Sequence, residues 1–333
     1  MLARRRAGCD GARPDPLRRK RGVGLAARLL VATWQEAGLA GCARKLWAAA
    51  AMGLPIVVRG HRTARSVGAY FDLITDDGRL FYGDSFHLGY FAGGSEGLEQ
   101  ALDAHTDLVA EYARLEHAES VLDVGCGLAA PALRIARRCG CRVTGVNISR
   151  EQVRQARALI ADHGLSDRVV VQRGDARALA FADASFDAIV CLEAAGDICV
   201  AEADKTRLVG ELFRLLRPGG YVGFSDLALQ QGVSAAEDRD VRAVLYHSAV
   251  ELVTDWPAIF AGQGFRLVEC RDIITDTLPT WDHVRAVYQR RNGEVTRRYG
   301  RRLANRTIAH LERIRGILAL YGTYPVIAAL KPW

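Results

Sequence analysis

Short apolar runs alternate with segments of helical period between residues 120 and 226 of this chain. Ser120–Val124 is typical of a buried strand, and the helix-like segment Ala130–Arg138 separates it from the next apolar run, Arg142–Val146. Strands separated by helices of this length predict an α/β fold with a doubly wound, mostly parallel sheet. The other expected strands are Val169–Gln172, Phe186–Leu192, Tyr221–Asp226, Phe265–Ile274 and Tyr324–Leu330, and the other expected helices are Gly97–Leu115, Arg150–His163 and Asp204–Leu216.

The length and composition are those of a globular protein. The chain has 333 residues, 50% of them hydrophobic, which suffices for one large core. Aromatic residues make up 8% and charged residues 25%, and these ordinary values exclude an intrinsically disordered chain. Eight cysteines form no CxxC pair, so we expect free thiols in a reducing compartment and hence a cytoplasmic location. We expect no metal site from them.

Charge is distributed unevenly along the chain. Residues 1–65 carry 14 Lys and Arg against 3 Asp and Glu, and residues 281–333 carry 11 against 3. Because the whole chain has a net charge of +7, residues 66–280 have a net charge of −12. An acidic middle suits a cationic ligand.

The first 22 residues are expected to be a basic, disordered leader. Nucleic-acid binding is the weaker interpretation, because no aromatic residues interleave with the arginines. The apolar runs that follow are interrupted by Arg28 or, at Leu46–Val58, shorter than the roughly 20 residues of a membrane span. We therefore expect no nucleic-acid partner and no stable membrane insertion, with targeting as an open alternative for the leader.

The loop after the first expected strand carries the most informative residues. Gly125 and Gly127 permit a tight turn and let a ligand lie against the backbone. Asp123, at the end of the strand, would repel the pyrophosphate of a dinucleotide and attract an ammonium group. Because ligands of open α/β sheets bind outside the carboxyl ends of the strands, this loop predicts a site for a ligand with an amino-acid moiety.

The next two strand ends carry polar residues that suit a nucleoside. Asn147 follows Asp123 by 24 residues, about the separation at which nucleotide-binding folds place their ribose-binding side chain. Gln152 would add a second contact, although a polar neighbour of a helix cap at Ser149 is a credible alternative. Asp175, after the third strand, can accept a hydrogen bond from an exocyclic amine such as that of adenine.

With Glu193 at the end of the fourth strand, the run from Val121 to Asp226 resembles the core of class I S-adenosylmethionine (SAM)-dependent methyltransferases. Residues 66–333 resemble the subgroup that contains cyclopropane-fatty-acid synthases, tocopherol-type and sarcosine-type methyltransferases and natural-product methyltransferases. The wider likeness depends on two segments, Tyr70–Phe71–Asp72 to Phe86–His87–Leu88–Gly89–Tyr90–Phe91 and the helical stretch from Trp281 to Leu320.

This resemblance implies a Rossmann-like sheet of seven strands, of which the last is antiparallel. It further implies an N-terminal helical lid within residues 23–115, a SAM-binding domain over 116–333 and a helical insertion at 281–320, before the last strand. SAM is the implied cofactor, with the glycines of the loop along its methionine moiety and Glu193 beside the methyl-transfer centre. The residues implied to bind it are Tyr70, Asp123, Gly125, Gly127, Asn147, Ile148, Gln152, Asp175, Ala176 and Glu193.

Three positions depart from the family pattern. Ala129 stands where the loop has a third glycine, Asn147 replaces an acidic residue, and Asp197 stands where many relatives have histidine. The last difference argues against a histidine base on that loop. For an acceptor that must lose a proton, the candidate bases are Glu193, Asp197, His87 and His247. A packed lid histidine is an equally good interpretation of His87, and ordinary helix packing is the favoured interpretation of His247.

The sequence leaves the methyl acceptor open. We expect a small molecule of the secondary-metabolite type, methylated at oxygen, nitrogen or carbon; a prenyl diphosphate and a lipid are the alternatives. Mg²⁺ is expected only with a diphosphate, to which the arginines of the helical insertion would also bind. An NAD-dependent oxidoreductase, a non-catalytic SAM-binding protein and a homo-oligomer remain open as well. The arginines concerned are Arg290, Arg291, Arg297, Arg298, Arg301, Arg302 and Arg306.

Overall fold

The computed structural model of the chain describes residues 63–230, 232–238, 253–293, 296 and 301–333. The expected leader and the first part of the expected N-terminal helical segment, residues 23–62, lie outside the described residues, as does His247. Of the seven insertion arginines, only Arg290 and Arg291 have described side chains.

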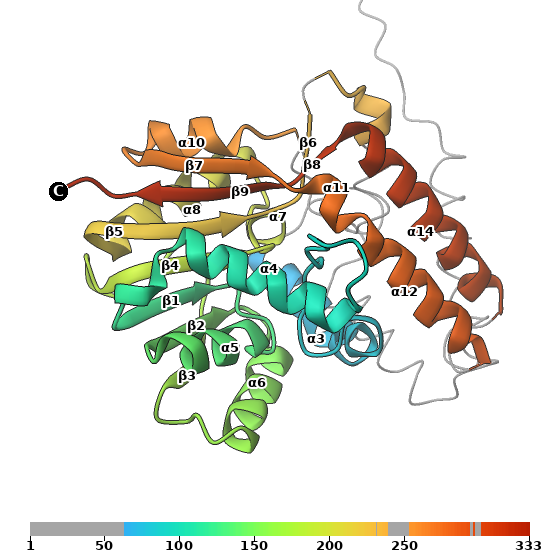
Figure 1. Ribbon diagram of the computed structural model, residues 1–333, viewed down its shortest axis with the longest axis horizontal. Helices are drawn as coiled ribbons and strands as arrows, with labels where there is room; N and C mark the ends of the chain where they lie inside the picture. The colour runs from blue at the N-terminus through green and yellow to red at the C-terminus, as the bar shows by residue number, and fades with distance from the viewer. Residues whose placement is uncertain (1–62, 231, 239–252, 294–295, 297–300) are drawn as a thin grey trace, which may run out of the picture.

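A seven-stranded sheet organises the described part of the chain, in the order β3-β2-β1-β4-β5-β9-β7. Strand β9 is antiparallel to both of its neighbours, and the other six strands run in one direction (Figure 1). The predicted Rossmann-like sheet with an antiparallel last strand is therefore confirmed. The strands are β1 (Ser120–Val124), β2 (Arg142–Asn147), β3 (Val169–Arg173), β4 (Phe186–Leu192), β5 (Leu216–Ser225), β7 (Arg266–Asp272) and β9 (Pro325–Leu330).

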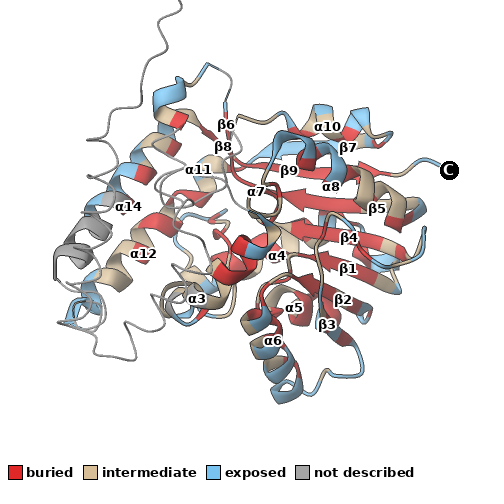
Figure 2. Ribbon diagram, turned by 180° about the vertical axis from the view of Figure 1, so that it is seen from behind, coloured by how far each residue is buried: buried red, intermediate tan, exposed pale blue. Residues whose placement is uncertain are grey.

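Alternating residues of the central strands pack into two separate hydrophobic cores, one on each face of the sheet. In β1, Val121 belongs to the core shared with the first group of helices, and Leu122 to the core shared with the second. Burial on both faces explains why these strands are mostly apolar, and Figure 2 shows them buried between partly exposed helices. The first group is α4 (Leu98–Tyr112), α5 (Ala130–Cys139) and α6 (Arg150–Asp162), and the second is α8 (Glu202–Leu215) and α10 (Trp256–Gly262).

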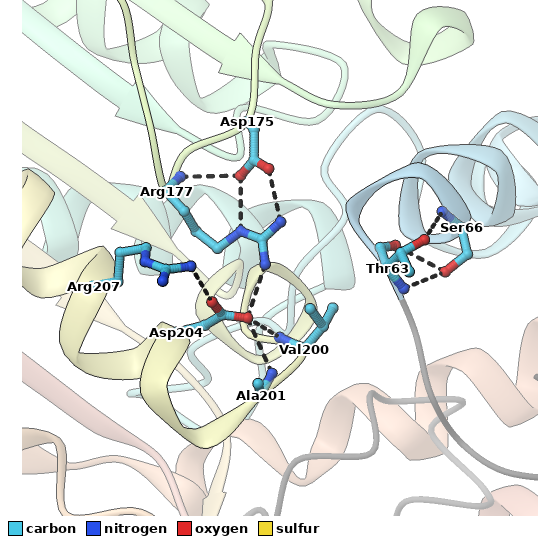
Figure 3. Close-up of polar contacts among 8 residues, drawn as sticks. All are labelled: Thr63, Ser66, Asp175, Arg177, Val200, Ala201, Asp204 and Arg207. Atoms are coloured by element: carbon cyan, nitrogen blue, oxygen red, sulfur yellow. Dashed lines mark hydrogen bonds and ion pairs between the residues drawn. The ribbon is translucent and has the colours of Figure 1, made fainter.

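Helix α3 (Ala64–Tyr82) begins the described chain and lies in the segment expected to be a lid; its described part, residues 63–115, is called the lid below. Its first turn is closed by a capping box, in which the side chain of Thr63 accepts from the amide of Ser66 and the side chain of Ser66 accepts from the amide of Thr63 (Figure 3). Asp72 fastens α3 to the start of α6, because its Oδ1 accepts from Ser149 Oγ at 2.6 Å and from the Glu151 amide at 3.0 Å.

The helical insertion is two helices rather than one stretch. Helices α12 (Pro279–Arg290) and α14 (Arg301–Tyr321) lie side by side at the end of the sheet that carries the lid (Figure 1). Arg315 and Arg285 tie them together through Asp282 and Glu312. The shorter elements are the 3₁₀ turn Leu115–His117, α7 (Ala195–Ile198), α11 (Ile274–Thr277) and the small sheet of β6 (Ala228–Leu229) and β8 (Gly322–Thr323).

The largest difference between an expected and an observed strand end is at β5, which begins five residues earlier than expected. Leu216 already pairs with Phe186, and an irregularity in register lies between Phe186 and Ala188 before the regular ladder begins. Among the described residues, no helix has both the length and the apolarity needed to cross a membrane.

Candidate cofactor and active site

A pocket opens at the carboxyl ends of β1, β2 and β4, between these strand ends and helix α3. It encloses about 1100 Å³, including its open mouth. Of the predicted site residues, every one except Tyr70 lines it. Those lining it are His87, Asp123, Gly125, Gly127, Asn147, Ile148, Gln152, Asp175, Ala176, Glu193 and Asp197.

Left-handed backbone shapes the loop between β1 and α5. Gly125 has φ of 79°, and a Cβ added there would lie 2.3 Å from the Cβ of Ala194 on the neighbouring loop. A side chain at this position would therefore force apart the two loops that form the pocket floor. Ala129 has φ of 67° and is the N-cap residue of α5, so the third position of the loop keeps the left-handed conformation without glycine.

Asp123 is the most distinctive polar group of the pocket. Its side chain is buried, and its Oδ2 has no hydrogen-bond partner among the described residues. Burial without a compensating partner raises the pKa of this carboxyl to about 7. A buried carboxylate costs free energy until a donor pairs with it, so the site favours a ligand that brings an ammonium group.

Asn147 and Gln152, both predicted to bind the ribose, differ in which of their side-chain atoms are already hydrogen-bonded. Asn147 Nδ2 donates to Gly127 O at 3.2 Å and to Gln152 Oε1 at 2.8 Å, and its Oδ1 accepts from the Ser149 amide. Its amide thus holds the glycine loop and orients Gln152. The Nε2 of Gln152 is the atom that is buried without a partner in the described structure, so Gln152 is the better placed of the two to donate to a ligand hydroxyl.

Asp175 lies on the pocket wall in a bidentate ion pair that the sequence did not suggest. Arg177 Nε and Nη2 donate to its two carboxylate oxygens at 3.0 and 2.7 Å (Figure 3). These bonds hold the pKa of Asp175 below its usual value. Arg177 itself lines the pocket. In the sequence, the only indication of this pair is that Arg177 follows Asp175 by two residues.

Glu193 joins the strand-end wall to the lid. Its Oε2 accepts from the Leu88 amide and from Tyr324 Oη, both at 2.6 Å. Its backbone has φ of 48°, a left-handed conformation that costs a residue with a side chain about 1–2 kcal/mol. The contacts to Leu88 and Tyr324 hold this conformation. The pKa of the Tyr82 phenol is raised, first by burial and then by the nearby negative charge of Glu193.

His87 is a buried lid residue that also reaches the pocket. Its Nδ1 lies 2.9 Å from Leu88 O, and Nδ1 of His105 lies 2.7 Å from the same oxygen. Both rings therefore donate to one carbonyl when they carry the Nδ1 proton. Burial, with the neighbouring His105, lowers the pKa of His87 to about 3. A neutral imidazole at this place can accept a hydrogen bond but does not store a proton near neutral pH.

Tyr70 and Asp197 complete the predicted set. Tyr70 packs against Phe71 with ring centroids 5.3 Å apart, and Phe71, not Tyr70, lines the pocket. Asp197 lies in α7 and faces the pocket beside Ile198. No group of three or more His, Cys, Asp or Glu among the described residues is placed to hold a metal ion.

Comparison with known proteins agrees with this geometry. A methyltransferase-domain family model matches residues 121–220. Methyltransferase GfsG of Streptomyces halstedii is 32% identical over 222 residues, which cover 65% of this chain and 78% of that protein. The chain belongs to the class I SAM-dependent methyltransferases. This membership excludes the NAD-dependent oxidoreductase considered from the sequence.

Two further relatives extend the comparison of this methyltransferase. The 27-O-demethylrifamycin SV methyltransferase of Amycolatopsis mediterranei is 32% identical over 224 residues, covering 66% of this chain and 80% of the relative. The crystal structure of the [4+2]-cyclase SpnF superposes with a TM-score of 0.68 at 25% identity, over 81% of this chain and 97% of that one.

The residues present fit SAM as the cofactor. The unpartnered Asp123 Oδ2 suits its ammonium group, and the unpartnered Gln152 Nε2 suits a hydroxyl. The left-handed glycine loop leaves space beside them, because a Cβ at Gly127 would meet no atom within 4 Å. Carboxylates around the pocket suit a cofactor that carries a sulfonium charge.

Proposed function

We propose that this methyltransferase methylates an uncharged, largely apolar small molecule of the secondary-metabolite type. The observation that carries the proposal is the charge of the pocket wall. Among the described lining residues, the carboxylates outnumber the cations, and the cation Arg177 is already bound in ion pairs to Asp175 and Asp204. The lining acidic residues are Asp84, Asp123, Asp175, Glu193 and Asp197. Asp84 is paired with Arg79 and Asp175 with Arg177, so Asp123, Glu193 and Asp197 make up the excess.

An anionic acceptor would meet repulsion in such a pocket. Two unit charges 4 Å apart interact by roughly 4 kcal/mol at an effective dielectric constant of 20, so each unbalanced carboxylate opposes a diphosphate substantially. Arg290 and Arg291, the described arginines proposed for a diphosphate, do not line the pocket. The prenyl diphosphate alternative therefore finds no support in the described site.

Apolar side chains supply the complementary surface for an uncharged acceptor. Phe71 and Phe86 reach the pocket from the lid, and Leu192 and Ile198 reach it from the strand-end side. Phe86 is pinned against α3, where a Cβ at Gly78 would lie 2.3 Å from its ring. This surface excludes water and orients an acceptor by burial of its apolar area.

When bound, SAM supplies an electrophilic methyl group. This chain's residues then need to hold the acceptor within about 3 Å of that carbon and, for a hydroxyl acceptor, to take its proton. We assign the proton-accepting role to Glu193, whose carboxylate is oriented by Leu88 and Tyr324. His87, neutral and bonded to Leu88 O, orients the lid peptide, and Asp197 of α7 also lines the pocket.

A matched pair of acceptors tests the proposal. The purified chain with methyl-labelled SAM is offered geraniol and geranyl diphosphate with Mg²⁺, together with a hydroxylated sterol and a hydroxylated macrolide. We expect label only in uncharged acceptors. Label in the diphosphate alone, or in no acceptor while S-adenosylhomocysteine (SAH) binds tightly, would contradict the proposal. Glu193→Gln serves as the site control, with SAH affinity retained and turnover reduced at least about 100-fold.

A further inference from the structure

Arg177 connects the pocket wall to a helix outside it. One edge of its guanidinium donates to both oxygens of Asp175, and Nη1 donates to Asp204 Oδ2 at 2.8 Å (Figure 3). The side chain is 14% exposed. We call the bidentate bond of Arg177 to Asp175 the fork. Because the guanidinium also bonds a second carboxylate through its other side, it has little freedom to rotate.

Asp204 is itself held by the backbone. Its Oδ2 accepts from the amides of Val200 and Ala201 at 3.1 and 3.0 Å, at the start of α8. Its side chain is 5% exposed. Arg207, on the outer side, donates to the other oxygen of Asp204 at 3.1 Å (Figure 3). A rigid path therefore runs from the start of α8 through Asp204 and Arg177 to Asp175.

The fork limits what Asp175 can still bind. Its Oδ1 accepts from Arg177 Nε and from the Arg177 amide at 3.1 Å, and its Oδ2 accepts from Nη2. A carboxylate has about four lone-pair positions, so about one remains, on Oδ2. The group is fixed in plane and remains an acceptor, because the ion pair opposes its protonation.

We propose that Arg177 is a positioning residue that makes Asp175 select a purine with an amino group at position 6 over one with an oxo group. The inference rests on SAM binding in this pocket and on the expectation from the sequence that Asp175 accepts from the exocyclic amine of adenine. An exocyclic amine donates to the remaining lone pair, whereas an oxo group places an acceptor against a fixed carboxylate. Without Arg177, Asp175 can turn away or take up a proton, and the penalty for the oxo group falls.

Calorimetry with two ligands tests the inference. SAH and S-inosylhomocysteine are titrated into the full chain, Arg177→Met and the control Arg207→Met, which removes the exposed partner of Asp204. We expect a preference for SAH of about 100-fold in the native chain and in Arg207→Met. In Arg177→Met we expect SAH affinity to fall about tenfold or more and the preference to fall below about tenfold. An equal loss for both ligands would show a merely structural role and overturn the inference.

Two more variants separate the possible failures. If Asp175→Asn leaves SAH affinity and the preference unchanged, the expectation that Asp175 accepts from the adenine amine is wrong, while the proposed acceptor class is untouched. If Asp175→Asn abolishes the preference and Arg177→Met does not, only the role of Arg177 is wrong. Arg177→Lys keeps the charge without the fork, so we expect it to recover SAH affinity but not the preference. If thermal unfolding shows that Arg177→Met is not folded, Arg177→Lys is used in its place.

Discussion

The two walls of the pocket use their polar groups in opposite ways. At the strand-end wall, Asp123 and Gln152 each bury a polar atom that has no partner among the described residues. At the lid wall, the Leu88 amide donates to Glu193, and Leu88 O lies within hydrogen-bond distance of Nδ1 of both His87 and His105. Most polar groups there therefore bond to one another, although Nε2 of His105, which does not line the pocket, has no partner among the described residues. The first wall is built to receive polar groups of a ligand, and the second presents apolar surface supported by an internal network.

This difference matches the two ligands of a methyltransferase. The cofactor is the same in every turnover and polar along its length, so unpaired groups that only it satisfies give selectivity. An acceptor that is largely apolar needs shape and exclusion of water instead. Variants at the strand-end wall should therefore change cofactor affinity, and variants at the lid wall should change turnover.

The largest effect is expected from the floor of the strand-end wall. Gly125→Arg should abolish SAH binding, because a Cβ there already meets Ala194 at 2.3 Å on left-handed backbone. The matched control is Gly164→Arg, at an exposed glycine with φ of 66° whose Cβ would meet nothing within 4 Å. Calorimetric SAH affinity that is equal in both variants would show that the loop does not form the cofactor site.

Asp123→Asn should weaken SAH binding at least about tenfold while stabilising the unliganded protein at pH 8. The folded-state pKa of Asp123 is raised to about 7 from 3.8, so its contribution to stability is lost as pH rises through 7. Removing the charge should recover on the order of 1–4 kcal/mol at pH 8 and little at pH 4.

Thermal unfolding at the two pH values, with and without SAH, measures both effects of the Asp123 variant. For the native chain, SAH affinity should rise between pH 6 and 8 as the carboxyl loses its proton. A variant that is less stable than the native chain at pH 8 would contradict the interpretation of Asp123 as a desolvated, unpaired group.

Gln152→Met should weaken SAH binding about tenfold, because it removes the unpartnered Nε2 that is available to the cofactor. It should also lower the melting temperature, because Gln152 Oε1 accepts from Asn147 Nδ2 at 2.8 Å and Met cannot. Gln155→Met is the control on the same helix, since Gln155 bonds to Asp76 and Glu151 and does not line the pocket. If calorimetry gives both variants the same SAH affinity, Gln152 does not contact the cofactor.

The smallest effect concerns the lid wall and the shape of a pH profile. Because the pKa of His87 is lowered to about 3, its ring stays neutral from pH 5 upward. The dependence of kcat on pH should then keep the same shape in His87→Gln, even where its magnitude falls. A limb near pH 6.5 in the native chain that disappears in the variant would identify His87 as a titrating base.

The fold was largely predictable because burial on both faces leaves a strong signal. β1 and β4 have the predicted bounds, since continuous apolar residues are needed wherever helices cover both sides of a strand. The predicted cofactor residues other than Tyr70 meet at one edge because they sit at, or soon after, the ends of parallel strands. Their roles as ligands of SAM stay predictions.

Other parts of the site depend on contacts between residues far apart in the chain. Glu193 meets Tyr324 across 131 positions and the Leu88 amide across 105, and no local pattern records either bond. Backbone groups such as Leu88 N carry no sequence signature at all. Arg177 was overlooked because its partner Asp204 lies 27 residues on, at a helix start that an ordinary capping pattern explains.

The attachment of α3 to α6 has a consequence for changing the acceptor range. Asp72 bonds to Ser149, whose own Oγ accepts from the Gln152 amide, and Gly68 packs against the Ile148 carbonyl at a distance that leaves little room for a side chain. Substitutions that reshape the lid through these two positions would be transmitted to the nucleoside end of the pocket. Directed evolution toward new acceptors should therefore vary Phe71 and Phe86 and keep Asp72 and Gly68 constant. Acceptor selectivity can then change while the affinity for the cofactor is retained.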